Sequence, residues 1–224
     1  MKPCVIFDLD GTLVDSLPGI AASLNRTLTA HGLPGHSNAN VRSFVGDGLQ
    51  MLIQRAVYPG ADPALIKSLV TFFKKDYDLS WAEGTRAYPG IHSMLHELQL
   101  DGFQMAVLSN KTHEFTGTIT RAVFPKIHFA QVLGQQDGIP HKPHPEGAFR
   151  IAAAMGDAPE RCIVIGDSTM DLETAANADM QAIAVTWGYH DRDRLLAAGA
   201  SRIAENPEEL LKMLREEFPG SDSD

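Results

Sequence analysis

Residues 4–12 read CVIFDLDGT, four apolar residues followed by a turn that carries two acids. An apolar run without a charge is typical of a strand that is buried on both faces, as in a parallel sheet. Similar runs follow at residues 103–108, 131–133, 162–165 and 180–185. Segments with helical spacing separate several of these runs, so the sequence predicts an α/β fold with a doubly wound parallel sheet.

One long stretch interrupts this alternation of strands and helices. Between residues 15 and 85 the apolar residues follow helical spacing, and no convincing strand is present. We therefore expect a small all-helical domain at residues 16–85, inserted after the first strand. The α/β core domain is then expected at residues 1–15 and 86–224.

Composition limits the kinds of partner. The 224 residues are 44% hydrophobic and 21% charged, as in globular proteins, and the net charge of −9 disfavours nucleic acid and anionic membranes. The sequence has two cysteines, and no apolar run approaches the roughly 18 residues that span a bilayer. The N-terminal apolar run is too short for a signal-peptide core, so we expect a cytoplasmic protein. The oligomeric state is left open between monomer and homodimer.

Four polar motifs follow the predicted strands. They are DLDGT at residues 8–12, LSNK at 108–111, HKPHPE at 141–146 and GDSTMD at 166–171. Ligands of open α/β sheets bind beyond the carboxyl ends of the strands, so these motifs predict a shared site. Taken singly, each also has a plain interpretation: an acid-rich turn, a helix N-cap at Ser109, or a solvated lysine.

Together, the order of the motifs resembles the haloacid dehalogenase superfamily of phosphatases. The resemblance covers nearly the whole chain and implies a Rossmann-like core with a helical cap inserted after the first strand. The residues that match the four family motifs are Asp8 with Asp10, Ser109, Lys142, and Asp167 with Asp171.

The resemblance implies a role for each acid of the first motif. Asp8 is expected to attack phosphorus and form an aspartyl-phosphate, and Asp10 to act as general acid and then as general base. A magnesium ion is expected between Asp8, the backbone carbonyl of Asp10, and Asp167, because Mg²⁺ prefers oxygen ligands. Asp171 and Thr12 are expected to orient these groups without touching the metal.

The resemblance also implies how the phosphoryl group is held. Ser109, the backbone of Asn110, and Lys142 are expected to contact its oxygens. In relatives the peptide bond after this lysine is often cis, so a cis bond is expected between Lys142 and Pro143.

The function predicted in this way is that of a magnesium-dependent phosphatase acting on a small phosphorylated metabolite. The dehalogenases and the phosphonate-cleaving branch lack an acid equivalent to Asp10. Residues 45–49 and 88–90 are similar to phosphoglycolate phosphatases, which makes 2-phosphoglycolate the candidate substrate. Residues 46–50 and Arg55 are candidates for setting specificity. A sugar-phosphate mutase and a non-catalytic module that binds phosphorylated ligands remain as alternatives.

Overall fold

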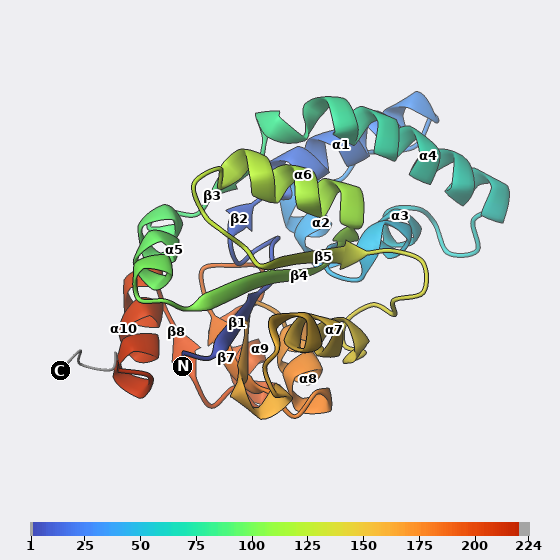
Figure 1. Cartoon of the computed structure of the whole chain (residues 1–224). Coiled ribbons are helices and arrows are strands. Elements are labelled where there is room, and N and C mark those ends of the chain that lie inside the picture. The colour runs from blue at the N-terminus through green and yellow to red at the C-terminus, as the bar shows by residue number, and fades with distance from the viewer. Residues whose placement is uncertain (1, 220–224) are drawn as a thin grey trace.

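Strand β1 (Cys4–Phe7) lies inside a six-stranded sheet in the computed structural model, which describes residues 2–219. The order of the strands is β5-β4-β1-β6-β7-β8, and every pairing is parallel (Figure 1). The other strands are β4 (Gln104–Thr112), β5 (Gln131–Gln135), β6 (Cys162–Gly166), β7 (Gln181–Val185) and β8 (Ile203–Ala204). The predicted doubly wound α/β fold is therefore confirmed.

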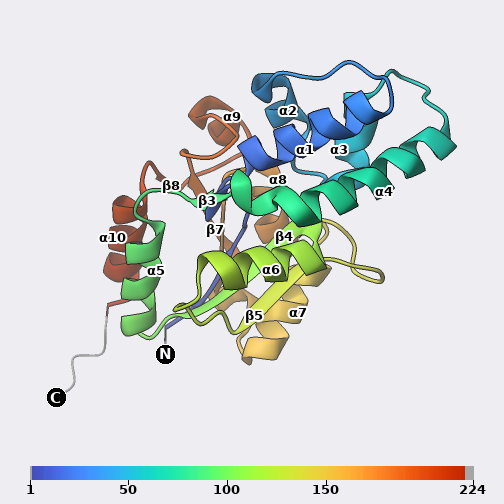
Figure 2. The ribbon, with the colours of Figure 1, turned by 90° about the horizontal axis from the view of Figure 1, so that it is seen from above.

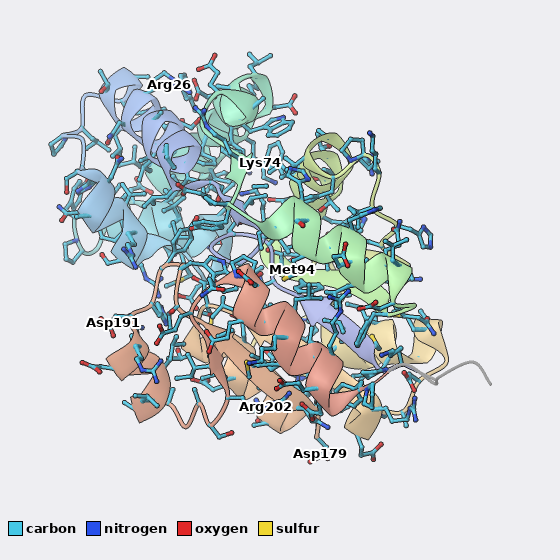
Figure 3. The ribbon with its side chains drawn as sticks, turned by 90° about the vertical axis from the view of Figure 1, so that its left-hand side faces the viewer. Arg26, Lys74, Met94, Asp179, Asp191 and Arg202 are labelled. Carbon is cyan, nitrogen blue, oxygen red and sulfur yellow. The ribbon has the colours of Figure 1, made fainter. Side chains whose placement is uncertain are left out.

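Helices cover both faces of this sheet. Side chains alternate between the faces along a strand, so Val5 and Phe7 of β1 pack on one side, and Cys4 and Ile6 on the other. The first face is covered by α5 (Ile91–Leu100), α6 (His113–Val123) and α10 (Pro207–Glu217). The second face is covered by α7 (Glu146–Met155) and α8 (Thr169–Asn177), and α9 (Arg192–Ala197) packs beside them. Met94 of α5 shows this packing, since its side chain is buried beside α10 (Figure 3).

The segment between β2 (Val14–Asp15) and β3 (Arg86–Ala87) is helical. It contains α1 (Leu17–Ala30), α2 (Asn38–Phe44), α3 (Gly48–Ala56), α4 (Pro63–Ser80) and the short 3₁₀ helix η1 (Trp81–Glu83). We call residues 17–83 the helical insert. Figure 2 shows its helices grouped to one side of the sheet. The assignment of residues 16–85 to a separate domain stays a prediction.

The two ends of the helical insert lie side by side. β2 and β3 pair in antiparallel orientation, with Val14 opposite Ala87 and Asp15 opposite Arg86. Inside the insert, α1 packs on α4, and Arg26 donates hydrogen bonds to Asp76 across this contact. The chain thus enters and leaves the helical insert through two adjacent segments, β2 and β3. Within residues 2–219, no helix combines the length and apolar character needed to cross a membrane.

Candidate active site

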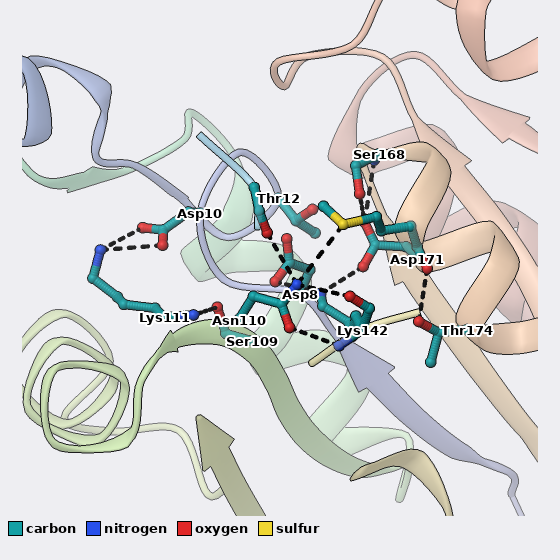
Figure 4. Close-up of polar contacts among 12 residues, drawn as sticks. Asp8, Asp10, Thr12, Ser109, Asn110, Lys111, Lys142, Ser168, Asp171 and Thr174 are labelled. Carbon is teal, nitrogen blue, oxygen red and sulfur yellow. Dashed lines mark hydrogen bonds and ion pairs between the residues drawn. The ribbon is translucent and has the colours of Figure 1, made fainter. Parts of the chain in front are cut away.

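The four motifs meet at the carboxyl ends of the central strands. β1 lies between β4 and β6, so Asp8 and Asp167, which follow β1 and β6, come together with Ser109 of β4. Figure 4 shows Asp8 near Ser109. They line a cavity of about 90 Å³ that is closed on its other side by residues of the helical insert. A cavity lined by apolar side chains with a few convergent polar groups is typical of sites that bind small molecules.

Lys142 is buried between two carboxylates. Its ammonium lies 2.8 Å from Asp8 Oδ1 and 2.6 Å from Asp171 Oδ1. The other oxygen of Asp171 accepts hydrogen bonds from the backbone N–H of Ser168, at 3.1 Å, and from its hydroxyl, at 2.6 Å. Asp171 is therefore fixed on both sides and holds Lys142 beside Asp8. The Lys142–Pro143 peptide bond is cis, as expected from the sequence.

Asp167 is held by the loop that follows β1 and by the loop that follows β7. Thr12 Oγ1 donates a hydrogen bond to Asp167 Oδ1 at 3.0 Å, and the N–H of Tyr189 donates to Oδ2 at 2.6 Å. Gly11 has a φ of 91°, and a Cβ at this position would lie 2.3 Å from Asp167 Oδ2. Only glycine allows the loop to approach the carboxylate this closely.

Asp8, Asp167 and Asp171 form a buried acidic cluster whose ligand oxygens lie within 4.8 Å of one another. Burial raises the pKa of Asp8 to about 7, although Lys142 opposes this shift. Burial, together with repulsion from Asp8 and Asp171, raises the pKa of Asp167 to about 8. Three carboxylates thus face one ammonium, and a divalent cation fits this excess of negative charge. The expected ligands Asp8 and Asp167 are in the cluster.

The side chain of Asp10 is not part of this cluster. Its two oxygens each accept a hydrogen bond from Lys111 Nζ at 3.1 Å (Figure 4). Ser16 Oγ donates to Oδ1 as well. Burial opposes the charge of Lys111, but pairing with Asp10 raises the pKa of this lysine above its ordinary value. Lys111 was not among the site residues predicted from the sequence, although it comes directly after Ser109 and Asn110 in the second motif.

Asn110 also has a part that the sequence did not indicate. Its side-chain oxygen accepts a hydrogen bond from the N–H of Lys142 at 2.7 Å, and its amide donates to the Lys142 carbonyl at 3.1 Å. The same amide donates to the carbonyl of Gly46 in the helical insert at 3.0 Å. Asn110 therefore joins the second motif to the third and to the insert.

Ser109 is buried within β4, which continues to Thr112 after a register shift that begins at Leu108. The alternative interpretation of Ser109 as a helix N-cap is therefore wrong, because α6 begins only at His113. Its Oγ accepts a hydrogen bond from the N–H of Lys111 at 3.2 Å and faces the same cavity as Asp8.

The first strand of the parallel sheet is followed by an acid that lies beside a buried lysine and within an acidic cluster. This arrangement is suited to phosphoryl transfer. The family model described as haloacid dehalogenase-like hydrolase matches residues 5–185, and the chain belongs to this family. It is a phosphoric monoester hydrolase that is similar to phosphoglycolate phosphatases.

Named relatives support this placement. The phosphoglycolate phosphatase of Pseudomonas putida is 33% identical over 221 residues, which cover 96% of this chain and 78% of the relative. That of Escherichia coli K12 is 30% identical over 94% of this chain and 91% of its own length. A crystal structure from Haemophilus somnus, described as a predicted phosphoglycolate phosphatase, has a TM-score of 0.88 at 29% identity and covers 95% of this chain and 97% of that one.

Proposed function

We propose that this protein is a magnesium-dependent phosphatase that hydrolyses 2-phosphoglycolate through an aspartyl-phosphate on Asp8. The observation that carries the proposal is the position of Asp8, buried at the end of β1 with Lys142 at 2.8 Å and Asp167 in the same acidic cluster. The names of the relatives supply the substrate. The expected cytoplasmic location stays a prediction.

In the first step, a carboxylate oxygen of Asp8 forms a bond to phosphorus while the bond from phosphorus to the ester oxygen breaks. The leaving alkoxide takes a proton from Asp10. In the second step, a water oxygen attacks phosphorus, Asp10 accepts a proton from this water, and the Asp8 carboxylate is released with inorganic phosphate. Each residue thus returns to its starting state.

Lys142 and Ser109 are proposed to hold the phosphoryl oxygens, together with the backbone N–H of Asn110. Asp171 acts through Lys142, because it fixes the ammonium next to Asp8. Mg²⁺, held by Asp8, Asp167 and the backbone carbonyl of Asp10, would offset the repulsion between a carboxylate and a phosphate dianion. The raised pKa values of Asp8 and Asp167 support a cation at this place.

The test is turnover of a panel of phosphorylated metabolites by the purified protein, with Mg²⁺ and with excess chelator. We expect 2-phosphoglycolate to have the highest kcat/KM and the chelator to abolish activity. Asp8→Asn should eliminate turnover and the acid-stable phosphoprotein seen by mass spectrometry, while the variant stays folded. Asp179→Asn is the matched control, since Asp179 is exposed and Asn tolerates its φ of 54°. Turnover by a clean Asp8→Asn preparation would overturn the proposal.

A further inference from the structure

A buried lysine and a buried tyrosine lie together in the cavity and have no part in the two steps described above. Lys111 belongs to β4, whereas Tyr77 comes from α4 of the helical insert. The Lys111 ammonium lies 4.8 Å from the centre of the Tyr77 ring. Both residues line the same cavity as Asp8 and Ser109, so a substrate held at Asp8 is near them.

The Tyr77 hydroxyl has an unmet hydrogen bond. The side chain is 1% exposed, and its oxygen has no partner within hydrogen-bond geometry among residues 2–219, although it lies near enough to Lys111 to help raise the pKa of that lysine. A buried polar group without a partner destabilises the folded protein, because it has lost its hydrogen bonds to water. An acceptor on a bound ligand would remove this cost, and the cavity is the space from which such a ligand could reach the hydroxyl.

The Lys111 ammonium has capacity for a further acceptor. An ammonium has three N–H donors, and the described part of the chain offers Lys111 a single carboxylate, that of Asp10. The second lysine that lines the cavity in this part of the chain, Lys142, is already shared between Asp8 and Asp171. Two cations therefore lie at two places in the cavity, one at the nucleophile and one at the general acid.

The walls around Lys111 and Tyr77 are apolar. The helical insert contributes the side chains of Ile20, Val45, Leu49, Leu52 and Phe73 to the cavity lining. Charges interact more strongly where apolar walls exclude water. In a chain of net charge −9, a substrate with two anionic groups needs a local cation for each of them.

We propose that Lys111 and Tyr77 are the residues that bind the carboxylate on the leaving-group part of the substrate and select for it over an uncharged group. The inference rests on the proposed phosphatase function. Lys142 recognises the phosphoryl end of the substrate, and Lys111 recognises the carboxylate end through a charge-assisted hydrogen bond. Tyr77 adds a neutral hydrogen bond from the helical insert, so the insert contributes to selectivity.

The test compares two ligands that differ only at the proposed contact. 2-Phosphoglycolate carries a carboxylate where 2-hydroxyethyl phosphate carries an uncharged alcohol. Binding to the Asp8→Asn variant with Mg²⁺ is measured by calorimetry, so that the ligands are not consumed. We expect 2-phosphoglycolate to bind about 10–100-fold more tightly, which is the range for hydrogen bonds to charged groups. Adding Lys111→Met should remove this preference, and adding Tyr77→Phe should reduce it in part.

Two controls separate selectivity from a structural effect. Lys74→Met is the matched control, because Lys74 lies on α4 with Tyr77 but is exposed (Figure 3), and it should keep the preference. Tyr77→Phe retains the ring and removes only the hydroxyl, so it tests the subsite even if Lys111→Met does not fold.

The outcomes distinguish the subsite from the reaction. An equal loss for both ligands in Lys111→Met would show that Lys111 serves only to hold Asp10 and would overturn the inference. The absence of any preference in the parent variant would overturn it too. If the unmutated enzyme turns over no phosphate ester, p-nitrophenyl phosphate included, while the carboxylate preference persists in binding, the phosphatase proposal fails and the subsite stands.

Discussion

The side-chain amide of Asn110 forms hydrogen bonds with both polar groups of the Lys142 backbone. The amide of Asn110 accepts from the Lys142 N–H and donates to the Lys142 carbonyl, and it also reaches the carbonyl of Gly46 in the helical insert. The lysine next to Asp8 is therefore positioned from two directions. Asn110 fixes its backbone and Asp171 fixes its ammonium.

Asn110→Ala should weaken phosphate binding and catalysis. The change leaves the buried Lys142 N–H without a partner, which should lower the free energy of unfolding by about 1–3 kcal/mol. A less firmly held Lys142 should reduce kcat/KM by about 10–100-fold and raise the inhibition constant of inorganic phosphate. Steady-state kinetics and denaturant unfolding measure both effects. Asn40→Ala, at an exposed position of α2, should change neither.

Gly11→Ala should weaken the metal site. The new methyl group would collide with the Asp167 carboxylate, since a Cβ at Gly11 lies 2.3 Å from Oδ2. We expect Mg²⁺ affinity to fall by about 10–100-fold, as for other changes beside metal ligands. Gly60→Ala is the matched control: its φ of 81° imposes similar backbone strain, but no atom lies within 4 Å of its Cβ. Equal Mg²⁺ affinity in the two variants, measured by calorimetry, would contradict the prediction.

The stability gained from Mg²⁺ should depend on pH. The pKa values of Asp8 and Asp167 in the folded protein, about 7 and about 8, lie above the ordinary value of 3.8. Without metal, these groups favour the folded state below their ordinary pKa, and this contribution is lost as the pH rises through the folded values. Mg²⁺ binds the charged carboxylates, so its stabilising effect should grow over the same range.

Thermal unfolding with and without Mg²⁺ measures this dependence. The increase in Tm on adding Mg²⁺ should be larger at about pH 8.5 than at about pH 5.5. Asp167→Asn should lose most of the difference because it removes one of the two titrating ligands. The same increase in Tm at both pH values in the unmutated protein would count against a metal bound by this cluster.

Asp10→Asn should separate substrates by their leaving groups. An alkoxide needs a proton from Asp10, whereas an aryl oxide leaves with little help. In single-turnover phosphorylation of Asp8, we expect a loss of about 10²–10⁴-fold for alkyl phosphates and a much smaller loss for p-nitrophenyl phosphate. Rapid-quench measurement of the phosphoenzyme gives both rates. A loss of similar size for the two substrate types would assign Asp10 a different role.

The fold was predictable where strands are buried on both faces. The uninterrupted apolar run at residues 4–7 predicted strand β1, and similar runs predicted the other central strands of the sheet. The apolar spacing in the sequence did not single out α2, α6, α8 or α9, whose buried residues are few or partly polar. In α2 a single residue, Val41, is buried, and the buried face of α6 includes Thr116, Gly117 and Thr120.

The candidate site was predictable in its parts but not in its contacts. The motif acids and Lys142 could be placed because their motifs come after predicted strands, and parallel strands end at the same edge of a sheet. The pairing of Lys111 with Asp10 depends on the continuation of β4 past Ser109 through a register shift. The pairing of Asn110 with Lys142 depends on the path of the loop before α7. Neither path leaves a periodic pattern in the sequence.

The antiparallel pair of β2 and β3 has a consequence for how such proteins diversify. Asp15 and Arg86 are opposite each other, so the chain between them begins and ends at nearly the same point. A segment anchored in this way can be lengthened, shortened or exchanged while the sheet and its four motifs stay where they are. Changes in the helical insert can therefore alter substrate preference while the catalytic residues on the sheet keep their positions.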